Sequence, residues 1–220
     1  MSWTKNREKL YEASVSTLRA ISKNKKITSK TGLSQRPPTS VNIALPNVPR
    51  SSKDIYKWRG ESDFQAFWHL FHKKTRDFQL TLPAKMIFNE LEISRVELLG
   101  CKKYLGSKKN ISEFTNARSD ELEDEKSLNF LSYGANLWIK KASGQYLTDN
   151  SKNILNKFID KYKIDDSCDL FRKNLLASID SQAEFEKNAL KLLKKINLLR
   201  EDFEEDELNI EDVPGSTDEI

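Results

Sequence analysis

The chain has 220 residues, 37% hydrophobic and 32% charged, which is enough for one large hydrophobic core or two small ones. It has no apolar run near the roughly 18 residues needed to cross a bilayer, and its N-terminus lacks the apolar core of a signal sequence. We therefore expect a cytoplasmic protein without membrane contact. Cys101 and Cys168 have no metal-binding spacing and are expected to be reduced.

The net charge of +4 conceals a division between the body and the C-terminus. Residues 201–220 contain ten acidic residues and no basic ones, so residues 1–200 carry 37 basic against 23 acidic residues, a net charge of +14. A body of this charge can bind nucleic acid, an anionic ligand or an acidic protein segment, including the chain's own tail. Charge alone does not choose among these partners.

The first predicted elements are a helix and a short extended region. Residues 5–23 have apolar residues at helical spacing, which predicts an amphipathic helix. Between residues 25 and 46, two short apolar runs are separated by Gly32 and Pro37. This pattern predicts a β-hairpin or a pair of extended segments.

Two helices are predicted in the middle of the chain. The first covers about 62–75, where aromatic residues form a tight stripe, and the second covers about 83–100, with Pro83 in its first turn. Residues 101–119 are rich in lysine and are expected to be a polar connection.

The C-terminal half is predicted to be helical and to end in an acidic tail. Four helices are expected, at about 122–142, 150–162, 167–178 and 181–203. The tail cannot bury enough apolar surface to fold alone and is expected to be disordered. The predicted fold is therefore mainly α (α+β), and it divides into three parts. These are a helical domain with a β-hairpin over 1–119, a helical subdomain packed on it over 120–203, and a disordered tail over 204–220.

The helix predicted at 83–100 carries an arginine within its apolar stripe. Arg95 lies between the apolar residues of one face, Glu92 is one turn away, and Glu90 and Glu97 point the other way. A buried charge without a partner costs several kcal/mol. We therefore predict that Arg95 is a buried clamp, paired with Glu92 or with Asp63 of the preceding helix.

The two histidines are the candidates for a metal site. His69 and His72 are three residues apart on one predicted helix and can present two nitrogens to a metal, with Glu92 as a third ligand. No HExxH motif and no cysteine partner accompanies them, so packing roles are favoured and no metal is expected. The chain also lacks the GxxxxGK[ST] and GxGxxG motifs of nucleotide-binding proteins, and Asp149 begins a run that falls short of DxSxS.

The N-terminal segment is strongly basic. Residues 5–59 hold thirteen basic and three acidic residues, with aromatic residues among them. Nucleic-acid-binding modules combine these residue types, but no RNP-like, helix-turn-helix or zinc pattern is present. A solvated basic surface, or one that faces an acidic protein, is favoured over nucleic-acid binding.

Several short motifs keep a fixed order over residues 10–200. They are Thr17-Leu18-Arg19-Ala20-Ile21-Ser22, Leu45-Pro46, Arg59-Gly60-Glu61-Ser62-Asp63, Ala66, His72, Phe88, Glu92, Arg95-Val96-Glu97, Gly100, Gly106, Asn110, Ile179-Asp180-Ser181-Gln182 and Phe185. This ordered set resembles the N-terminal region of the CobT subunit of the aerobic, ATP-dependent cobaltochelatase. The structural signature that the resemblance implies consists of Asp63, His72, Glu92, Arg95, Glu97 and Gly100.

The resemblance implies a role in cobalt insertion into a corrin ring, hydrogenobyrinic acid a,c-diamide in this family. A separate AAA+ subunit supplies ATP hydrolysis, and a third, large subunit holds the corrin and the metal. On this reading the complex uses ATP, Mg and Co, while the chain binds no cofactor, has no catalytic residues and acts as an assembly module. Whether it forms a homo-oligomer is left open.

The family pattern continues beyond the features found here. Members usually pass through an acidic linker into a von Willebrand A domain with a metal-adhesion site. The chain stops where that linker begins, so it resembles an N-terminal fragment, a split gene product or a degenerate paralogue.

A second, fainter resemblance is to zinc peptidases of the HExxH type. In these enzymes a later helix supplies a glutamate, as in Glu92-x-x-Arg95-x-Glu97, but here Arg59-Gly60-Glu61-Ser62-Asp63 stands where HExxH would be. The zinc ligands and the general base are therefore missing. A degenerate zincin-like metallopeptidase scaffold and a basic nucleic-acid-binding protein are the two alternatives to the chelatase role.

Overall fold

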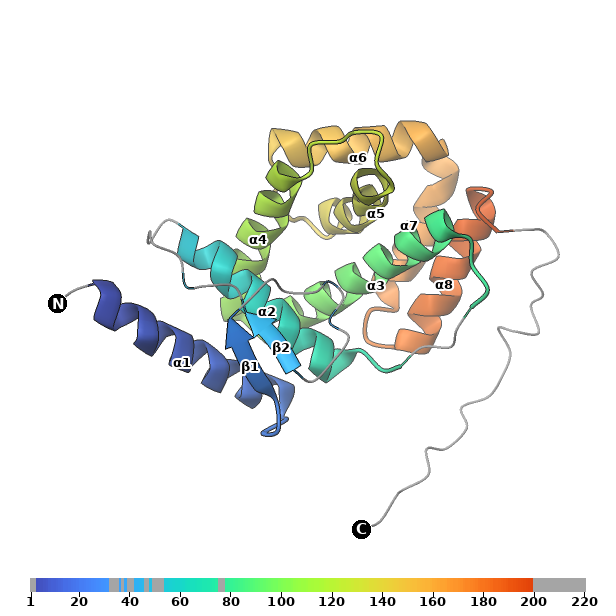
Figure 1. Cartoon of the computed structure of the whole chain (residues 1–220). Coiled ribbons are helices and arrows are strands. Elements are labelled where there is room, and N and C mark those ends of the chain that lie inside the picture. Colours follow the sequence, from blue (N-terminus) through green and yellow to red (C-terminus); the bar gives the residue numbers. More distant parts are fainter. Residues whose placement is uncertain are drawn as a thin grey trace, which may run out of the picture.

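A computed structural model describes residues 3–31, 36, 38, 42–45, 48, 54–74 and 78–199, and it is mainly helical, as predicted (Figure 1). In chain order the elements are α1 (Trp3–Ser22), β1 (Thr28–Thr31), β2 (Asn42–Leu45), α2 (Ile55–Phe71), α3 (Leu82–Lys103), α4 (Lys108–Glu121), α5 (Leu128–Ala142), α6 (Asp149–Tyr162), α7 (Asp169–Ala177) and α8 (Gln182–Lys195). Short 3-10 turns at Leu105–Ser107 and Asp166–Cys168 precede α4 and α7.

The prediction of a polar connection over 101–119 is wrong, because most of α4 lies there. Its apolar residues are few, but Ile111 and Phe114 are buried at a spacing of three residues. Much of the remaining inner face is polar and buried, including Asn110, Thr115 and Ser119. These side chains are hydrogen-bonded, so a buried face without an apolar stripe is still stable here.

The prediction of a β-hairpin is also wrong. Strands β1 and β2 pair in parallel, with Thr28 opposite Asn42 and Thr31 opposite Leu45. Parallel strands cannot be joined by a tight turn and need a longer crossover connection. The extended character of both segments was predicted correctly, but the strand direction was not.

The described residues form three hydrophobic clusters, and α3 contributes to the two larger ones. The largest cluster joins α3 to the C-terminal helices through residues such as Leu91, Tyr133 and Phe185. A second cluster joins α2, α3 and α4 around Phe67. The smallest one holds α1 against α2 through Leu18. In Figure 1, α3 accordingly lies between the N-terminal elements and the C-terminal helices.

Helices α2 and α3 approach closely at Gly100. A Cβ atom at this position would lie 2.2 Å from the ring of Phe67, which is fully buried on α2. Glycine is therefore required by space rather than by backbone conformation. Gly60 has the same role between α2 and α4, where a Cβ would lie 2.2 Å from the Asn110 carbonyl oxygen.

Nothing in this arrangement supports the zincin-like scaffold. The segment Arg59–Asp63, which stands where HExxH would be, lies within α2 and packs against α4 at Gly60. The predicted disordered tail lies outside the described residues, and the division at residues 119 and 203 stays a prediction. Within the described part of the chain, no helix has the length and apolar character needed to span a membrane.

Candidate functional site

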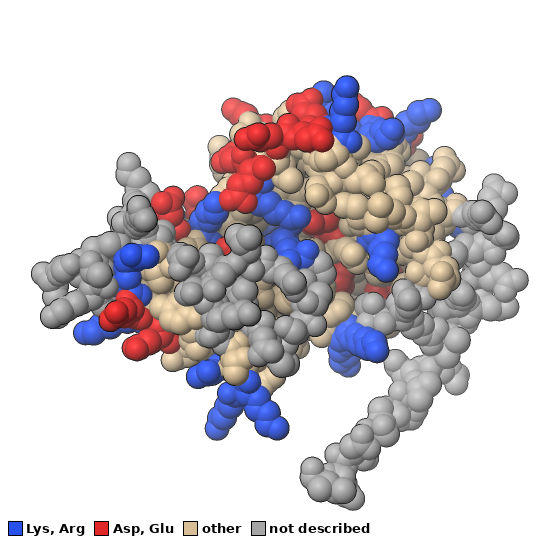
Figure 2. Space-filling model, in the orientation of Figure 1, with Lys and Arg blue, Asp and Glu red and all other residues tan. Residues whose placement is uncertain are grey.

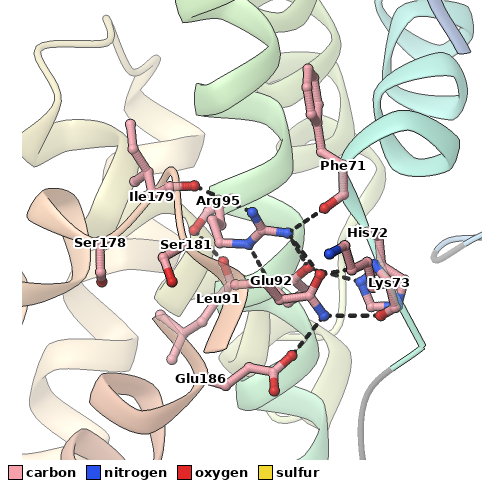
Figure 3. A network of polar contacts seen from close by, with 12 residues as sticks. Phe71, His72, Lys73, Leu91, Glu92, Arg95, Ser178, Ile179, Ser181 and Glu186 are labelled. Carbon is pink, nitrogen blue, oxygen red and sulfur yellow. Dashed lines mark hydrogen bonds and ion pairs between the residues drawn. The ribbon is translucent and has the colours of Figure 1, made fainter. Parts of the chain in front are cut away.

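Arg95 is buried at the junction of three segments, with 1% of its surface exposed (Figure 3). Its Nε and Nη2 atoms donate to the two carboxylate oxygens of Glu92, each at 2.7 Å. It also donates to the carbonyl oxygens of Phe71 (2.8 Å) and Ile179 (3.2 Å) and to Oε1 of Gln182 (3.3 Å). The predicted pair with Glu92 is confirmed, and the clamp joins α3 to the end of α2 and the start of α8.

The alternative partner, Asp63, has a different role. Its carboxylate accepts a hydrogen bond of 2.7 Å from Nδ2 of Asn110 on α4. Burial raises the pKa of Asp63, while hydrogen bonds from Asn110 and Ser107 act in the opposite direction. Asp63 therefore connects α2 to α4 and not to Arg95.

The two histidines differ in their surroundings. The Nδ1 atom of His72 lies 2.8 Å from Oε1 of Glu92, and its ring stacks on Trp68 with the centroids 3.9 Å apart. The Nε2 atom of His69 is buried without a hydrogen-bond partner, and burial lowers the pKa of this ring. Among the described residues, no group of three or more His, Cys, Asp or Glu side chains is placed to hold a metal ion.

Gln182 completes the clamp, and spacing alone did not indicate this role. Its Nε2 donates to the carbonyl of Lys73 (2.9 Å) and to Glu186 (2.7 Å), and its Oε1 accepts from the Lys73 backbone N–H (2.8 Å). One side-chain amide therefore fixes the start of α8 against the chain that leaves α2. The only sequence signal was the motif Ile179–Gln182 of the family resemblance.

The opposite face of α3 carries a second buried network, which we call the Glu97 cluster and define as Arg36, Glu97, Thr115, Asn136 and Lys140. Glu97 is fully buried and accepts from Nζ of Lys140 at 2.6 Å and from Nη2 of Arg36 at 2.9 Å. Lys140 also donates to the Thr115 hydroxyl, and Asn136 donates to Glu97 at 3.5 Å. Burial opposes ionisation, but Arg36 and Lys140 outweigh it and lower the pKa of Glu97 to about 2.

Glu90 extends this network two turns along α3. It pairs with Nη2 of Arg118 on α4 at 2.7 Å, and the Arg118 guanidinium lies 4.4 Å from the ring centroid of Tyr133. The Tyr133 hydroxyl donates to the Thr115 carbonyl at 2.8 Å, and burial raises its pKa above the ordinary value. Both charged faces of α3 are therefore buried, and Glu90 and Glu97 face α4 and α5 instead of solvent.

The pair of Glu97 with Lys140 joins α3 to α5, and the pair of Glu90 with Arg118 joins α3 to α4. Arg95 and Glu92 both lie on α3, and Arg95 reaches the other segments through the carbonyl oxygens of Phe71 and Ile179. The nearby thiol of Cys101 offers no activated nucleophile, because burial raises its pKa to about 12. Both cysteines are free thiols. The buried ion pairs are suited to holding the helices in fixed positions, so that the surface of the body is available to a partner.

The surface does not carry one continuous basic face in the view of Figure 2. Lysine and arginine side chains are scattered there, and acidic side chains gather where α4 and α6 meet. Five exposed acidic residues follow one another closely at the end of α4, namely Asp120, Glu121, Glu123, Asp124 and Glu125. On this face both charge signs are available to a protein partner.

Comparison with known proteins identifies one family. The family model described as cobalamin biosynthesis protein CobT matches residues 4–219, which include both networks. Neither a curated protein nor a solved structure matches the chain.

Proposed function

The chain belongs to the CobT family of cobalamin biosynthesis proteins, and from this premise we propose that it is a non-catalytic assembly module of a cobaltochelatase-type complex. An AAA+ subunit supplies ATP hydrolysis with Mg, and a large subunit holds the corrin. Cobalt is the substrate that the complex inserts into hydrogenobyrinic acid a,c-diamide. The chain contributes a rigid helical body that links these subunits.

The observation that carries this proposal is that the buried charged side chains point into the helical body. Arg95 pairs with Glu92 and also donates to the carbonyl oxygens of Phe71 and Ile179, while Lys140 pairs with Glu97, all inside the helical body. Such pairs fix helix positions, whereas a catalytic group must reach a substrate. A body stabilised in this way supports an assembly role.

The test is reconstitution with the two expected partners. The purified chain is mixed with the AAA+ subunit in the presence of ATP and Mg, with the large subunit, and with both, and each mixture is analysed by size-exclusion chromatography. We expect co-elution with at least one partner, cobalt insertion only in the full mixture, and none by the chain alone. A chain that stays a free monomer in all three mixtures contradicts the proposal.

Two variants compare the loss of a buried contact with the loss of an exposed one. Lys102 forms an exposed ion pair with Asp180, and such pairs contribute at most about 1 kcal/mol, so Lys102→Ala is expected to keep the fold and serves as the control. Arg95→Met loosens the junction between α3 and α8 and is expected to weaken association. Circular dichroism on both variants shows whether the fold is retained.

A further inference from the structure

Arg95 and Arg36, the arginines of the two networks, differ in how completely they are hydrogen-bonded. Each of the three guanidinium nitrogens of Arg95 donates to an acceptor. In Arg36 only Nη2 donates, to Glu97, while Nε and Nη1 have no hydrogen-bond partner among the described residues. A buried donor without an acceptor is unfavourable, because it has lost its hydrogen bonds to water. Arg36 is therefore held less firmly than Arg95.

The groups around Arg36 combine two aromatic rings with a carboxylate. Its Cζ atom lies 4.4 Å from the ring centroid of Phe64 and 5.1 Å from that of Phe114, and Glu97 accepts from the guanidinium at 2.9 Å. We call Phe64, Glu97 and Phe114 the Arg36 seat. A planar cation gains both from stacking on aromatic rings and from a carboxylate acceptor, and an ammonium gains less from this combination.

The departure of Arg36 leaves no buried charge alone. Glu97 keeps its ion pair with Lys140 at 2.6 Å, and both side chains are fully buried. Arg36 also comes from outside the helical body, since it follows β1, a strand of only four residues. By contrast, removing Arg95 leaves Glu92 with His72 alone.

We propose that the Arg36 seat is an arginine-binding site which Arg36 occupies reversibly, and that an arginine side chain of a partner protein competes for it. The partner is defined by this chemistry, so the inference holds whichever proteins the chain assembles with. Binding by the partner displaces the side chain of Arg36 from the seat.

The first test empties the seat and offers it a small cation. Arg36→Ala is titrated with methylguanidinium chloride. The control is methylammonium chloride at equal concentration, whose cation has the same charge but lacks the planar guanidinium group. We expect the variant to fold and methylguanidinium to raise its Tm by about 2–4 °C more than methylammonium does. Wild type, whose seat is filled, should show a smaller difference. Equal shifts with both salts, or a variant that does not fold when the seat is emptied, overturn the proposal.

The second test asks whether a foreign arginine side chain enters the seat. N-acetylarginine amide and N-acetyllysine amide are added to Arg36→Ala, and the backbone amide signals of Phe64 and Phe114 are followed by NMR. We expect saturable shifts with the arginine compound only, and at least ten-fold weaker binding to wild type, because its own Arg36 competes at high effective concentration. If the arginine compound binds wild type and variant equally, it binds outside the seat. If it binds neither protein, only Arg36 itself can occupy the seat. Either result makes the proposal wrong.

Discussion

The buried carboxylates of Glu92 and Glu97 replace their lost hydration with particular sets of partners. The carboxylate of Glu92 accepts two hydrogen bonds from Arg95 and lies beside Nδ1 of His72, while Glu97 is shared between Lys140 and Arg36. Removing one partner of a buried pair costs more than removing both, because the remaining charge stays out of water. The consequences of substitution therefore depend on what is left behind.

Arg95→Met is expected to lower the free energy of unfolding by about 3–5 kcal/mol, because Glu92 is only 3% exposed and keeps His72 as its one side-chain neighbour in the network. The double variant Arg95→Met with Glu92→Met should recover much of this loss, since no charge remains unpaired. Urea unfolding followed by circular dichroism measures both. A single variant within about 1 kcal/mol of wild type is incompatible with a buried clamp.

Glu61 makes stability depend on pH near neutrality. Burial, with repulsion from Glu121, raises its pKa to about 7 against the attraction of Arg36 and Lys57. A pKa above the unfolded value of 4.5 means that the protonated form is favoured in the folded state. Its contribution to stability is therefore complete below pH 4.5 and is lost as the pH rises through 7.

Glu61→Gln removes this dependence. The free energy of unfolding of the variant minus that of wild type should be higher at pH 8 than at pH 5 by roughly 1 kcal/mol. This value is small because solvent partly screens the charge of Glu61. Thermal unfolding at the two pH values measures the difference, with the exposed Glu123→Gln as the control. If both variants track wild type at the two pH values, the carboxyl of Glu61 has an ordinary pKa.

At the scale of elements, the fold depends on how closely α2 approaches its neighbours. Gly100 on α3 allows the ring of Phe67 to lie against the α3 backbone, and Gly60 allows α4 to approach α2 in the same way. Such contacts bring side chains from three helices into one cluster. They also set the distance across which Asp63 reaches Asn110.

Gly100→Ala should therefore destabilise the protein by about 1–3 kcal/mol, because the added methyl group overlaps the buried Phe67 ring. Gly106→Ala is the matched control, since a Cβ atom there meets nothing within 4 Å, and its effect should stay within about 0.5 kcal/mol. Chemical denaturation measures both. Equal effects of the two substitutions rule out close packing as the reason for Gly100.

At the scale of the whole molecule, α3 ties the N-terminal and C-terminal helices together. It packs in the two larger hydrophobic clusters and carries an ionic network on each face. The Arg95 clamp reaches from Phe71 of α2, 24 residues earlier in the sequence, to Ile179 before α8, 84 residues later. Neither the N-terminal helices nor the C-terminal helices can lose their packing without exposing part of α3.

We therefore expect unfolding to be a single cooperative transition. Hydrogen exchange at increasing denaturant should give the slowest amides of α2 and α8 the same opening free energy. Arg95→Met should lower both values together. Amides of α8 that open well before those of α2 would show that the C-terminal helices are a separate cooperative unit.

Local patterns in the sequence were sufficient for part of this structure. Apolar residues at helical spacing predicted most of the helices. The spacing of three residues made Glu92 one of the two predicted partners of Arg95, and it is the one that the structure shows. The ordered motifs also indicated the CobT family that the family model shows.

Only the tertiary structure decided the contacts between distant segments. Arg36 and Glu97 are 61 residues apart, and Asn110 and Asp63 are 47 apart, so no helical or strand period relates them. The same reason explains the parallel pairing of β1 with β2 and the polar inner face of α4, whose buried residues are stabilised by partners on other helices. The sequence by itself determined that the chain is helical and offered Glu92 and Asp63 as the partners of Arg95. Packing determined what else each charge meets, because hydrogen bonds across the core depend on where the helices lie.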